Sequence, residues 1–277
     1  MLNGVNMDVI EIIKDAFVFP SKDIKVLVIY VLLSILAGAF SFIGTFVYIL
    51  GFITPECFMW GGIACIVSML IGWVLAGYLI SIIKSGIELD DEVPGFEWWE
   101  NFITGFNNFI VTIVYFIIPA FIVVVVGYLT NIYGNFMIIA NEVMSQAQNV
   151  YMGNSTFILS EAASQAIANL MISLSITIMV ALVLFVIFSF LQTMAQARLA
   201  NTGSLGEALN VVEAAKDIRR IGVGKVIVVI LLIIIIIAVI EMILSSVPFL
   251  AILSIIISPY LLFFAQRAVG LLYSDIA

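Results

Sequence analysis

Histidine is absent from this 277-residue sequence, and cysteine occurs only twice. The sequence therefore lacks the side chain that most often serves as a metal ligand or as an acid or base near neutral pH. Cys57 and Cys65 are too far apart for a CxxC pair and too few for a zinc site or a disulfide framework. We expect no metal or other cofactor, and we interpret both thiols as small apolar side chains in or near a membrane helix.

Charged residues are also scarce. They make up 10% of the sequence, compared with about 25% in a typical soluble domain, and the mean hydropathy is +1.27. This composition excludes a soluble globular protein. The net charge of -8 argues against nucleic acid as a partner, because phosphate binding requires a basic surface. The first residues lack the basic start and cleavage site of a secretory signal, so we expect no cleaved leader.

Six long apolar runs follow one another along the chain, and each is close to or above the roughly 20 residues that cross a bilayer. They cover approximately residues 24–52, 58–83, 109–129, 163–197, 226–244 and 249–272. The predicted fold is all-α, a polytopic membrane helical bundle with six transmembrane helices. In the second run Ala64, Ser68, Gly72 and Ala76 recur every four residues. This spacing predicts a seam for close helix packing, with a pore-lining face as the alternative.

Amphipathic segments precede the first, third and fifth runs, beginning near Met7, Pro94 and Ser204. Their helical periodicity is typical of helices that lie in the membrane interface. We therefore expect three hairpins of transmembrane helices, each preceded by a cytoplasmic amphipathic interfacial helix. The whole chain, 1–277, would form a single membrane domain. Its repeat-like units would cover about residues 7–84, 94–200 and 204–277.

All ten Lys and Arg residues fall on the side of the six-span arrangement that holds both termini. By the positive-inside rule that side is cytoplasmic. We therefore predict a multi-pass protein of the cell membrane with cytoplasmic N- and C-termini. Pro119 and Pro259, near the middle of the third and sixth spans, leave an alternative of two inverted three-helix repeats, as in many transporters.

A polar stripe runs along the first half of the fourth span, where Gln165, Asn169, Ser173 and Thr177 recur every four residues. Polar groups avoid hydrocarbon, so the stripe should face the interior of the bundle. It can be a packing stripe of interhelical hydrogen bonds or a polar path for a solute. Glu241, late in the fifth span, is a candidate for the same path or a residue at the outer rim.

Acidic side chains gather at residues 90–92, in the loop after the second span. Their adjacent positions do not match the alternating spacing of a calcium loop. We interpret them as a solvated acidic face, and we expect them to pair with Lys216, Arg219 and Arg220 of the third amphipathic segment.

Two further features concern the surfaces of the membrane. Trp98 and Trp99 are expected to be interfacial anchors, because tryptophan favours the headgroup layer. Asn154 begins an N-glycosylation sequon. The sequon matters only on an extracytoplasmic face, and chance occurrence also explains it.

A set of residues from the second and third spans resembles the pattern of a known family: Gly77-Tyr78, Pro94, Trp98-Trp99, Gly105, Tyr115 and Pro119. The family consists of multi-spanning membrane proteins of unknown function and is frequent in methanogenic archaea. The resemblance covers most of the chain and implies a membrane fold, but no activity. More distantly, the chain is similar to the membrane portion fused to some glycerophosphodiester phosphodiesterases. No hydrolase domain is attached here, so that activity is not implied.

No catalytic, metal or nucleotide signature stands out, so we expect a protein without enzymatic activity. The first hypothesis is a membrane scaffold or interaction protein, in contact with lipid, with itself or with another membrane protein. The alternative is a transporter or channel subunit with a polar path along the fourth transmembrane helix. A membrane-embedded enzyme is the third hypothesis.

Overall fold

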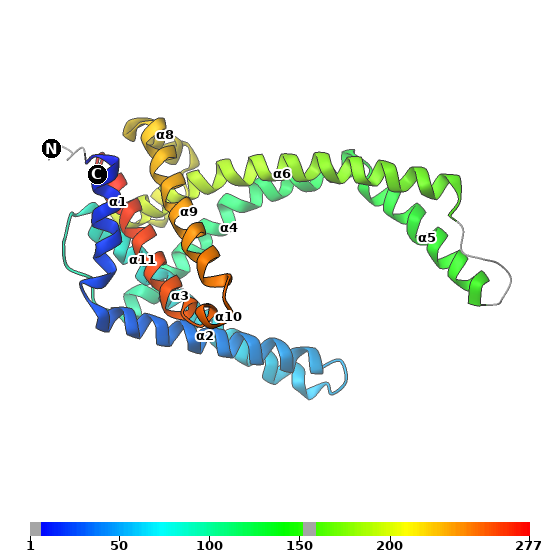
Figure 1. Ribbon diagram of the computed structural model, residues 1–277, viewed down its shortest axis with the longest axis horizontal. Coiled ribbons are helices and arrows are strands. Elements are labelled where there is room, and N and C mark those ends of the chain that lie inside the picture. The colour runs from blue at the N-terminus through cyan, green and yellow to red at the C-terminus, as the bar shows by residue number, and fades with distance from the viewer. Residues whose placement is uncertain (1–6, 152–158) are drawn as a thin grey trace. The chain divides into compact units, whose positions relative to one another are not determined.

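The computed structural model describes residues 7–151 and 159–277, and the chain is all-α without strands in these ranges (Figure 1). The elements are α1 (Val9–Val18), the 3-10 helix η1 (Phe19–Ser21), α2 (Ile24–Leu50), α3 (Glu56–Ile87), α4 (Trp98–Leu129), α5 (Ile132–Tyr151), α6 (Glu161–Thr202), α7 (Leu205–Ala208), α8 (Val211–Ile221), α9 (Val223–Ser245), α10 (Pro248–Ala251) and α11 (Ser254–Tyr273). Six of these described helices are long and apolar enough to cross a membrane: α2, α3, α4, α6, α9 and α11. The predicted all-α class and the six spans are confirmed.

The amphipathic segments differ in form from the prediction. The segment after Pro94 is not a separate helix but the first part of α4, which runs without a break from Trp98 into the third span. The segment after Ser204 is divided into α7 and α8. Ser204 caps α7 by accepting from the backbone N–H of Glu207, and Asn210 then caps α8 by accepting from that of Glu213. The side chain of Asn210 accepts a hydrogen bond from an N–H group in the first turn of α8, which has no backbone acceptor within the helix. This cap lets a new helix begin there. The three-hairpin arrangement stays a prediction.

Backbone contacts divide the chain into two compact units, which are described separately. Unit 1 consists of Met1–Thr112 and Leu191–Ala277, and unit 2 of Ile113–Phe190. The helices α4 and α6 contribute residues to both units. The proposed single domain and its three repeat-like units stay predictions.

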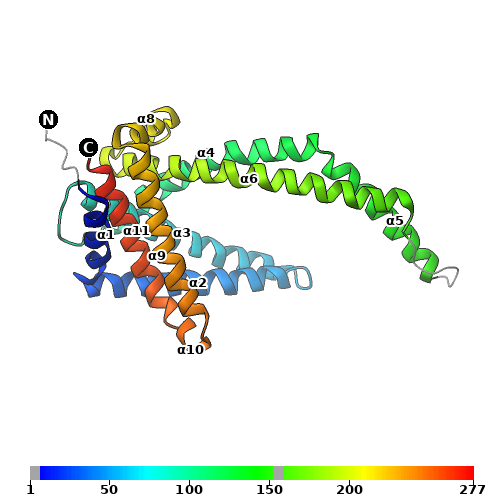
Figure 2. The ribbon, with the colours of Figure 1, turned by 45° about the horizontal axis from the view of Figure 1, so that its top comes forward.

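In unit 1, α11 is the central helix. It packs against α1, α2, α3 and α9, and 56% of its most apolar window is buried, compared with 22% in α2, α3 and α9. An aromatic cluster fills the junction of α2, α3 and α11: the ring of Phe263 lies 4.9 Å from that of Tyr30 and 5.4 Å from that of Tyr78. Figures 1 and 2 both show α2 and α3 side by side.

Glycines determine how closely α3 approaches its neighbours. A Cβ atom on Gly77 would overlap the backbone carbonyl of Asn101 in α4, and one on Gly105 would overlap the carbonyl of Trp73 in α3. Gly86 and Gly270 form a similar crossing between α3 and α11. The two glycines of the Gly-Tyr…Gly pattern therefore meet at one crossing, where only glycine allows the backbones to touch.

The predicted seam of small residues on α3 is used in part. Ser68 donates a hydrogen bond to the carbonyl of Ala37 in α2 at 2.8 Å, and Ala64 lies against Gly44 of α2. Gly72, by contrast, has no atom within 4 Å of the position of a Cβ. The seam therefore serves the α2–α3 contact over its first two turns but not at Gly72.

Unit 2 is a smaller helical unit. The rings of Phe116 in α4 and Phe185 in α6 stack with centroids 5.7 Å apart, and Tyr115 is fully buried. Further along the same helices, Ser173 donates to the carbonyl of Thr130 at 2.6 Å. The second half of α4 is thus tied to α6 by both apolar and polar contacts.

Candidate functional site

Two buried ion-pair networks lie in unit 1, and the first joins the end of α6 to α8 and α11. Asp217, on α8, is fully buried. It accepts from Arg198 of α6 at 2.7 Å and from the hydroxyl of Tyr273 of α11 at 2.9 Å. Arg198 also donates to the carboxylate of Glu207 at 2.5 Å. These bonds pair buried charges that would be costly to leave alone.

The second network is centred on Arg267 of α11, which is only 1% exposed. Its guanidinium donates to Asp15 of α1 at 3.1 Å and to the carbonyl of Asp90, in the loop after α3, at 2.6 Å. Ser85 of α3 accepts a further bond at 3.3 Å. The guanidinium also lies over the ring of Phe19, 4.3 Å from its centroid. One side chain therefore ties together four separate segments.

The predicted pairing of the acidic loop with the third amphipathic segment is wrong. Asp91 pairs instead with Lys22, before α2, at 2.9 Å. The hydrogen bond and charge of Lys22 lower the pKa of Asp91 below its ordinary value. On α8, Lys216 and Arg220 bind Glu213, which lies on their own helix and is therefore reached without any tertiary contact. Asp91, Lys216 and Arg220 thus each have a nearer partner than the one predicted.

Within unit 1, a line of hydrogen bonds between side chains joins the first half of α4 to the last part of α6. Gln192 donates to Thr112 at 2.8 Å, and Gln196 donates to Asn108 at 3.1 Å. We name these four residues the polar seam. The polar seam was not predicted from the sequence, although Gln192 and Gln196 are four residues apart, as are Asn108 and Thr112, so each pair lies on one helix face.

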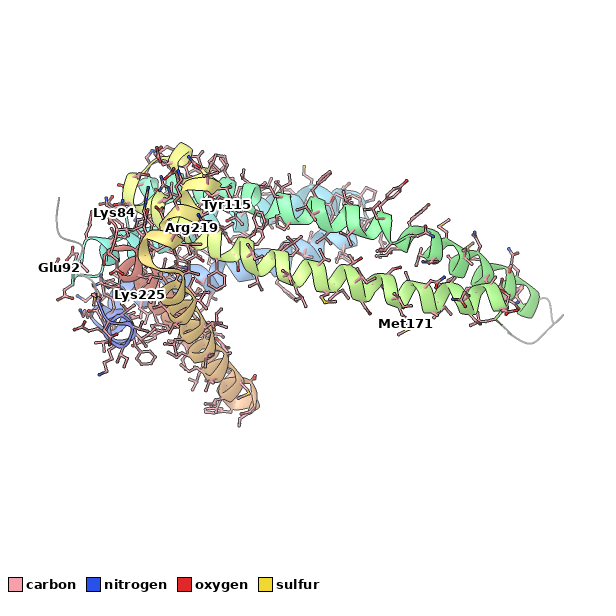
Figure 3. All side chains as sticks on the ribbon, turned by 90° about the horizontal axis from the view of Figure 1, so that it is seen from above. Lys84, Glu92, Tyr115, Met171, Arg219 and Lys225 are labelled. Atoms are coloured by element: carbon pink, nitrogen blue, oxygen red, sulfur yellow. The ribbon has the colours of Figure 1, made fainter. Side chains whose placement is uncertain are left out.

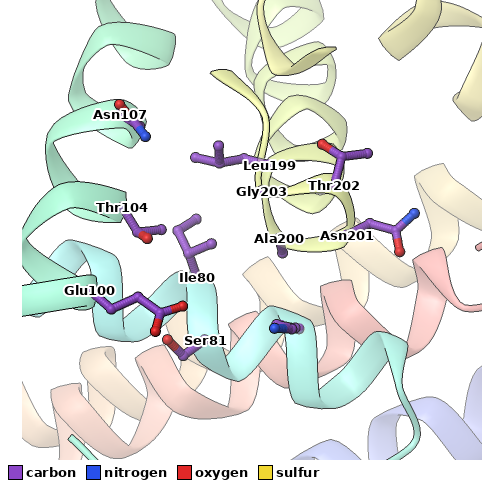
Figure 4. Close-up of a pocket in the computed structure, with 11 residues that line it drawn as sticks. Ile80, Ser81, Glu100, Thr104, Asn107, Leu199, Ala200, Asn201, Thr202 and Gly203 are labelled. Carbon is purple, nitrogen blue, oxygen red and sulfur yellow. The ribbon is translucent and has the colours of Figure 1, made fainter. Parts of the chain in front are cut away.

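At one end of the polar seam, a pocket of about 220 Å³ opens between α3, α4 and the last turn of α6 (Figure 4). Its lining combines charged, amide and hydroxyl groups: Ile80, Ser81, Lys84, Glu100, Thr104, Asn107, Leu199, Ala200, Asn201, Thr202 and Gly203. Figure 4 shows the carboxylate of Glu100 and the hydroxyl of Ser81 directed toward each other across the lower part of this space. The pocket is the candidate site of unit 1.

Lys84 and Glu100 also line a second hollow of about 320 Å³, which the acidic loop after α3 borders. A hydrogen bond shared between the two carboxyl groups, together with the negative charge of Glu100, raises the pKa of Glu97 above its ordinary value. The carboxyl groups of Glu97 and Glu100 thus lie close together in this second hollow, which both residues line. Figure 3 shows Lys84 and Glu92 at the same end of unit 1 as Arg219 and Lys225.

Close to the pocket, Asn101 carries an unsatisfied group. Its side chain is 1% exposed, and its Oδ1 accepts from Ser81 at 3.2 Å. Its Nδ2 has no hydrogen-bond partner within the described part of the chain. A buried donor without a partner costs free energy. Asn101 is therefore a polar group that the contacts within the chain do not fully satisfy.

The predicted polar stripe lies in unit 2. Gln165 donates to Asn169 at 3.2 Å, and both side chains are exposed. Ser173 is buried against the carbonyl of Thr130, and Thr177 bonds back to the carbonyl of Ser173 on its own helix. Asn169 and Ser173, but not the other two, border a polar pocket of about 270 Å³. The four residues therefore have different environments, and their role as a path or packing stripe stays a prediction.

The other predicted residues are distributed as follows. Glu241 of α9 is half-buried and accepts from Ser258 of α11 at 2.7 Å. Trp98 and Trp99 are exposed, as an anchor in the headgroup layer requires. The sequon at Asn154 lies outside the described residues. The two cysteines are free and half-buried.

The described residues contain no group of three or more Cys, Asp or Glu that could hold a metal ion. The expectation that the protein has no cofactor stays a prediction.

Fold and site together define a multi-spanning α-helical membrane protein whose Lys and Arg residues all belong to unit 1. The family described as "Protein of unknown function (DUF4013)" matches residues 60–249, and the chain belongs to this family. The matched region contains the crossing of Gly77 and Gly105 and the whole pocket. No curated protein and no solved structure matches the chain.

Proposed function

We propose that the protein is a membrane scaffold without catalytic activity of its own, which associates with lipid and with itself or another membrane protein. The observation that carries this proposal is that the buried charged side chains form ion pairs within the chain. The buried Arg198 and Asp217 bond to each other, and the buried Arg267 bonds to the half-buried Asp15 of a neighbouring helix. These groups hold a framework together instead of facing a reaction centre, which supports a structural role.

The exposed apolar surface of the spans supports the same proposal. In α2, α3 and α9 only 22% of the most apolar window is buried. Large side chains such as Phe42 and Phe46 on α2 are more than half exposed. Surface of this kind requires lipid or a second protein as its neighbour.

We infer that the protein lies in the cell membrane with both termini in the cytoplasm. All ten Lys and Arg residues belong to unit 1. Among them, Lys22 and Lys25 flank the start of α2, and Lys84 lies near the end of α3. The packing of α1 against α11 supports placing both ends of the chain on this basic side, which the positive-inside rule makes cytoplasmic. The topology is tested by replacing Asp8 or Asp275 with cysteine and comparing how readily a membrane-impermeant thiol reagent labels it in intact cells and in inverted vesicles.

The scaffold proposal is tested by counting copies of the full-length protein, labelled with one fluorophore per chain, in lipid bilayers and in detergent. Association that requires the bilayer is expected, seen as two or more bleaching steps per spot at low protein-to-lipid ratio. Cross-linking in native membranes tests whether the protein associates with another membrane protein. Single bleaching steps in the bilayer together with only single chains after cross-linking would overturn the proposal.

A transporter or channel subunit is the second candidate, and the polar seam between α4 and α6 favours it. Hydrogen-bonding groups in the apolar part of a helix are expensive unless they serve packing or a solute. Solute flux into proteoliposomes tests this function. A route along the predicted stripe requires flux that falls in Thr177→Val and Glu241→Gln. A route along the polar seam requires flux that falls in Gln192→Leu, with Ser175→Ala, an exposed serine of α6, as the control.

A further inference from the structure

The pocket of unit 1 presents one cationic and one anionic side chain, Lys84 from α3 and Glu100 from α4. No carboxylate of the described residues lies within salt-bridge distance of the Lys84 amine, whereas Arg198, Lys225 and Arg267 all have such partners. The side chains of Lys84 and Glu100 are both exposed. The pocket therefore keeps two opposite charges available to a ligand.

Glu100 forms the anionic side of the pocket. Glu97 and Glu100 are crowded against each other, which raises the pKa of Glu97. The helix α6 ends at the same place: Thr202 is its last residue, and Gly203 follows with a φ of 64°. The last carbonyls of a helix have no intrahelical donors and carry partial negative charge. A ligand with a primary ammonium group satisfies both features.

The depth of the pocket in the membrane follows from its neighbours on α4. Trp98 and Trp99 are exposed at the start of α4, and tryptophan side chains concentrate in the headgroup layer. Glu100 is the next residue, and Asn107 lies seven residues further on, about 10 Å along the helix at 1.5 Å per residue. The pocket therefore begins at the level of the lipid headgroups, and this favours a lipid over a dissolved molecule.

We infer that this pocket binds the headgroup of an aminophospholipid, with phosphoethanolamine as the moiety recognised. The phosphate lies against Lys84, and the ammonium lies against Glu100 and the end of α6. The amide of Asn107, which also lines the pocket, is a further hydrogen-bond donor for the headgroup. A phosphocholine headgroup has no N–H to donate, and a phosphoglycerol headgroup has no positive charge. This inference deepens the proposed function, because it names the lipid class that the scaffold recognises.

The test is native mass spectrometry of the full-length protein in detergent, with phosphatidylethanolamine, phosphatidylcholine and phosphatidylglycerol of identical acyl chains as probes. Phosphatidylethanolamine is expected to bind most tightly. Glu100→Gln and Lys84→Met are each expected to weaken that binding about tenfold or more, since each removes one charge-assisted hydrogen bond. Glu92→Gln is the matched control, because Glu92 lines only the second hollow, and it should leave binding unchanged.

Equal binding of the three lipids would overturn the inference, as would unchanged affinity in both pocket variants. Free phosphoethanolamine, added as a competitor, separates the two sources of this chemistry. If free phosphoethanolamine competes only weakly, the ligand is a lipid. If it binds as tightly as phosphatidylethanolamine, the assignment to a lipid is overturned. Thermal unfolding without lipid verifies that the variants are folded. The measurement uses single copies in detergent, so its failure is distinguishable from a failure of the scaffold proposal, which concerns association in the bilayer.

Discussion

The guanidinium of Arg267, on the last helix, donates to the carboxylate of Asp15, on the first, at 3.1 Å across 252 residues of sequence. This bond fastens α1 to α11. Because Arg267 also binds the Asp90 carbonyl and Ser85, the loop after α3 is held at the same point. The two ends of the chain are thus connected through one buried cation.

Replacing Arg267 should therefore destabilise the protein more than replacing Asp15. Arg267→Met removes the bonds to Asp15, Asp90 and Ser85 together. Asp15→Asn removes only the charge of one partner that is itself partly exposed. We expect a loss of about 3–5 kcal/mol for the first, the range for a broken buried pair, and about 1–2 kcal/mol for the second. Thermal unfolding in detergent checks the order, with the exposed Lys25→Met as the control; equal shifts in Tm for all three would contradict it.

Asp217 should be equally critical for the end of α6. Asp217→Asn leaves the buried guanidinium of Arg198 without its best acceptor and weakens the bond from Tyr273. We expect a loss of about 3–5 kcal/mol. Glu213→Gln on the same helix breaks only exposed ion pairs and should have little effect. A denaturant titration of both variants gives the comparison, and similar midpoints would show that the buried network is not a source of stability.

The crossing of α3 and α4 predicts opposite outcomes for two glycines of one helix. Gly77→Ala places a Cβ on the backbone of Asn101 and should cost about 1–3 kcal/mol, as overpacking does. Gly72→Ala meets no atom within 4 Å and should be neutral or stabilising by up to about 1 kcal/mol, because alanine is the better helix former. Tm values of the two variants, measured side by side, decide the matter. A neutral Gly77→Ala would rule out the close crossing.

The pair of Asp91 and Lys22 predicts a dependence of stability on pH. Lys22 holds the pKa of Asp91 below its ordinary 3.8, so the folded protein binds this proton less readily than the unfolded chain. The pair therefore stabilises the fold above that pH, and the contribution disappears as the pH falls through the lowered pKa. Asp91→Asn should lower Tm at pH 7, and this difference should shrink steadily as the pH falls below 3.8. Glu88→Gln is the control, and a difference that persists at the acidic end would refute the linkage.

The polar residues show what a four-residue spacing in the sequence can and cannot predict. Spacing of four residues correctly places Gln165, Asn169, Ser173 and Thr177 along one helix, yet their environments range from exposed to buried. The same spacing at Gln192 and Gln196 marks the polar seam of unit 1. Periodicity identifies a face of a helix, but it does not identify what lies opposite that face.

The sequence by itself determined the class of protein, the number of spans and, except for the start of the third helix, approximately where each begins and ends. These follow from a local rule: a helix is the structure that satisfies every backbone group within one segment, and about 20 apolar residues suffice to cross a bilayer. Only the tertiary structure decided which residues contact one another across helices. Gly77 needs to be glycine because the Asn101 carbonyl touches it, and Asp91 binds Lys22 instead of α8. Such contacts depend on which helix faces arrive together, and this is a property of the packed chain and not of any single segment.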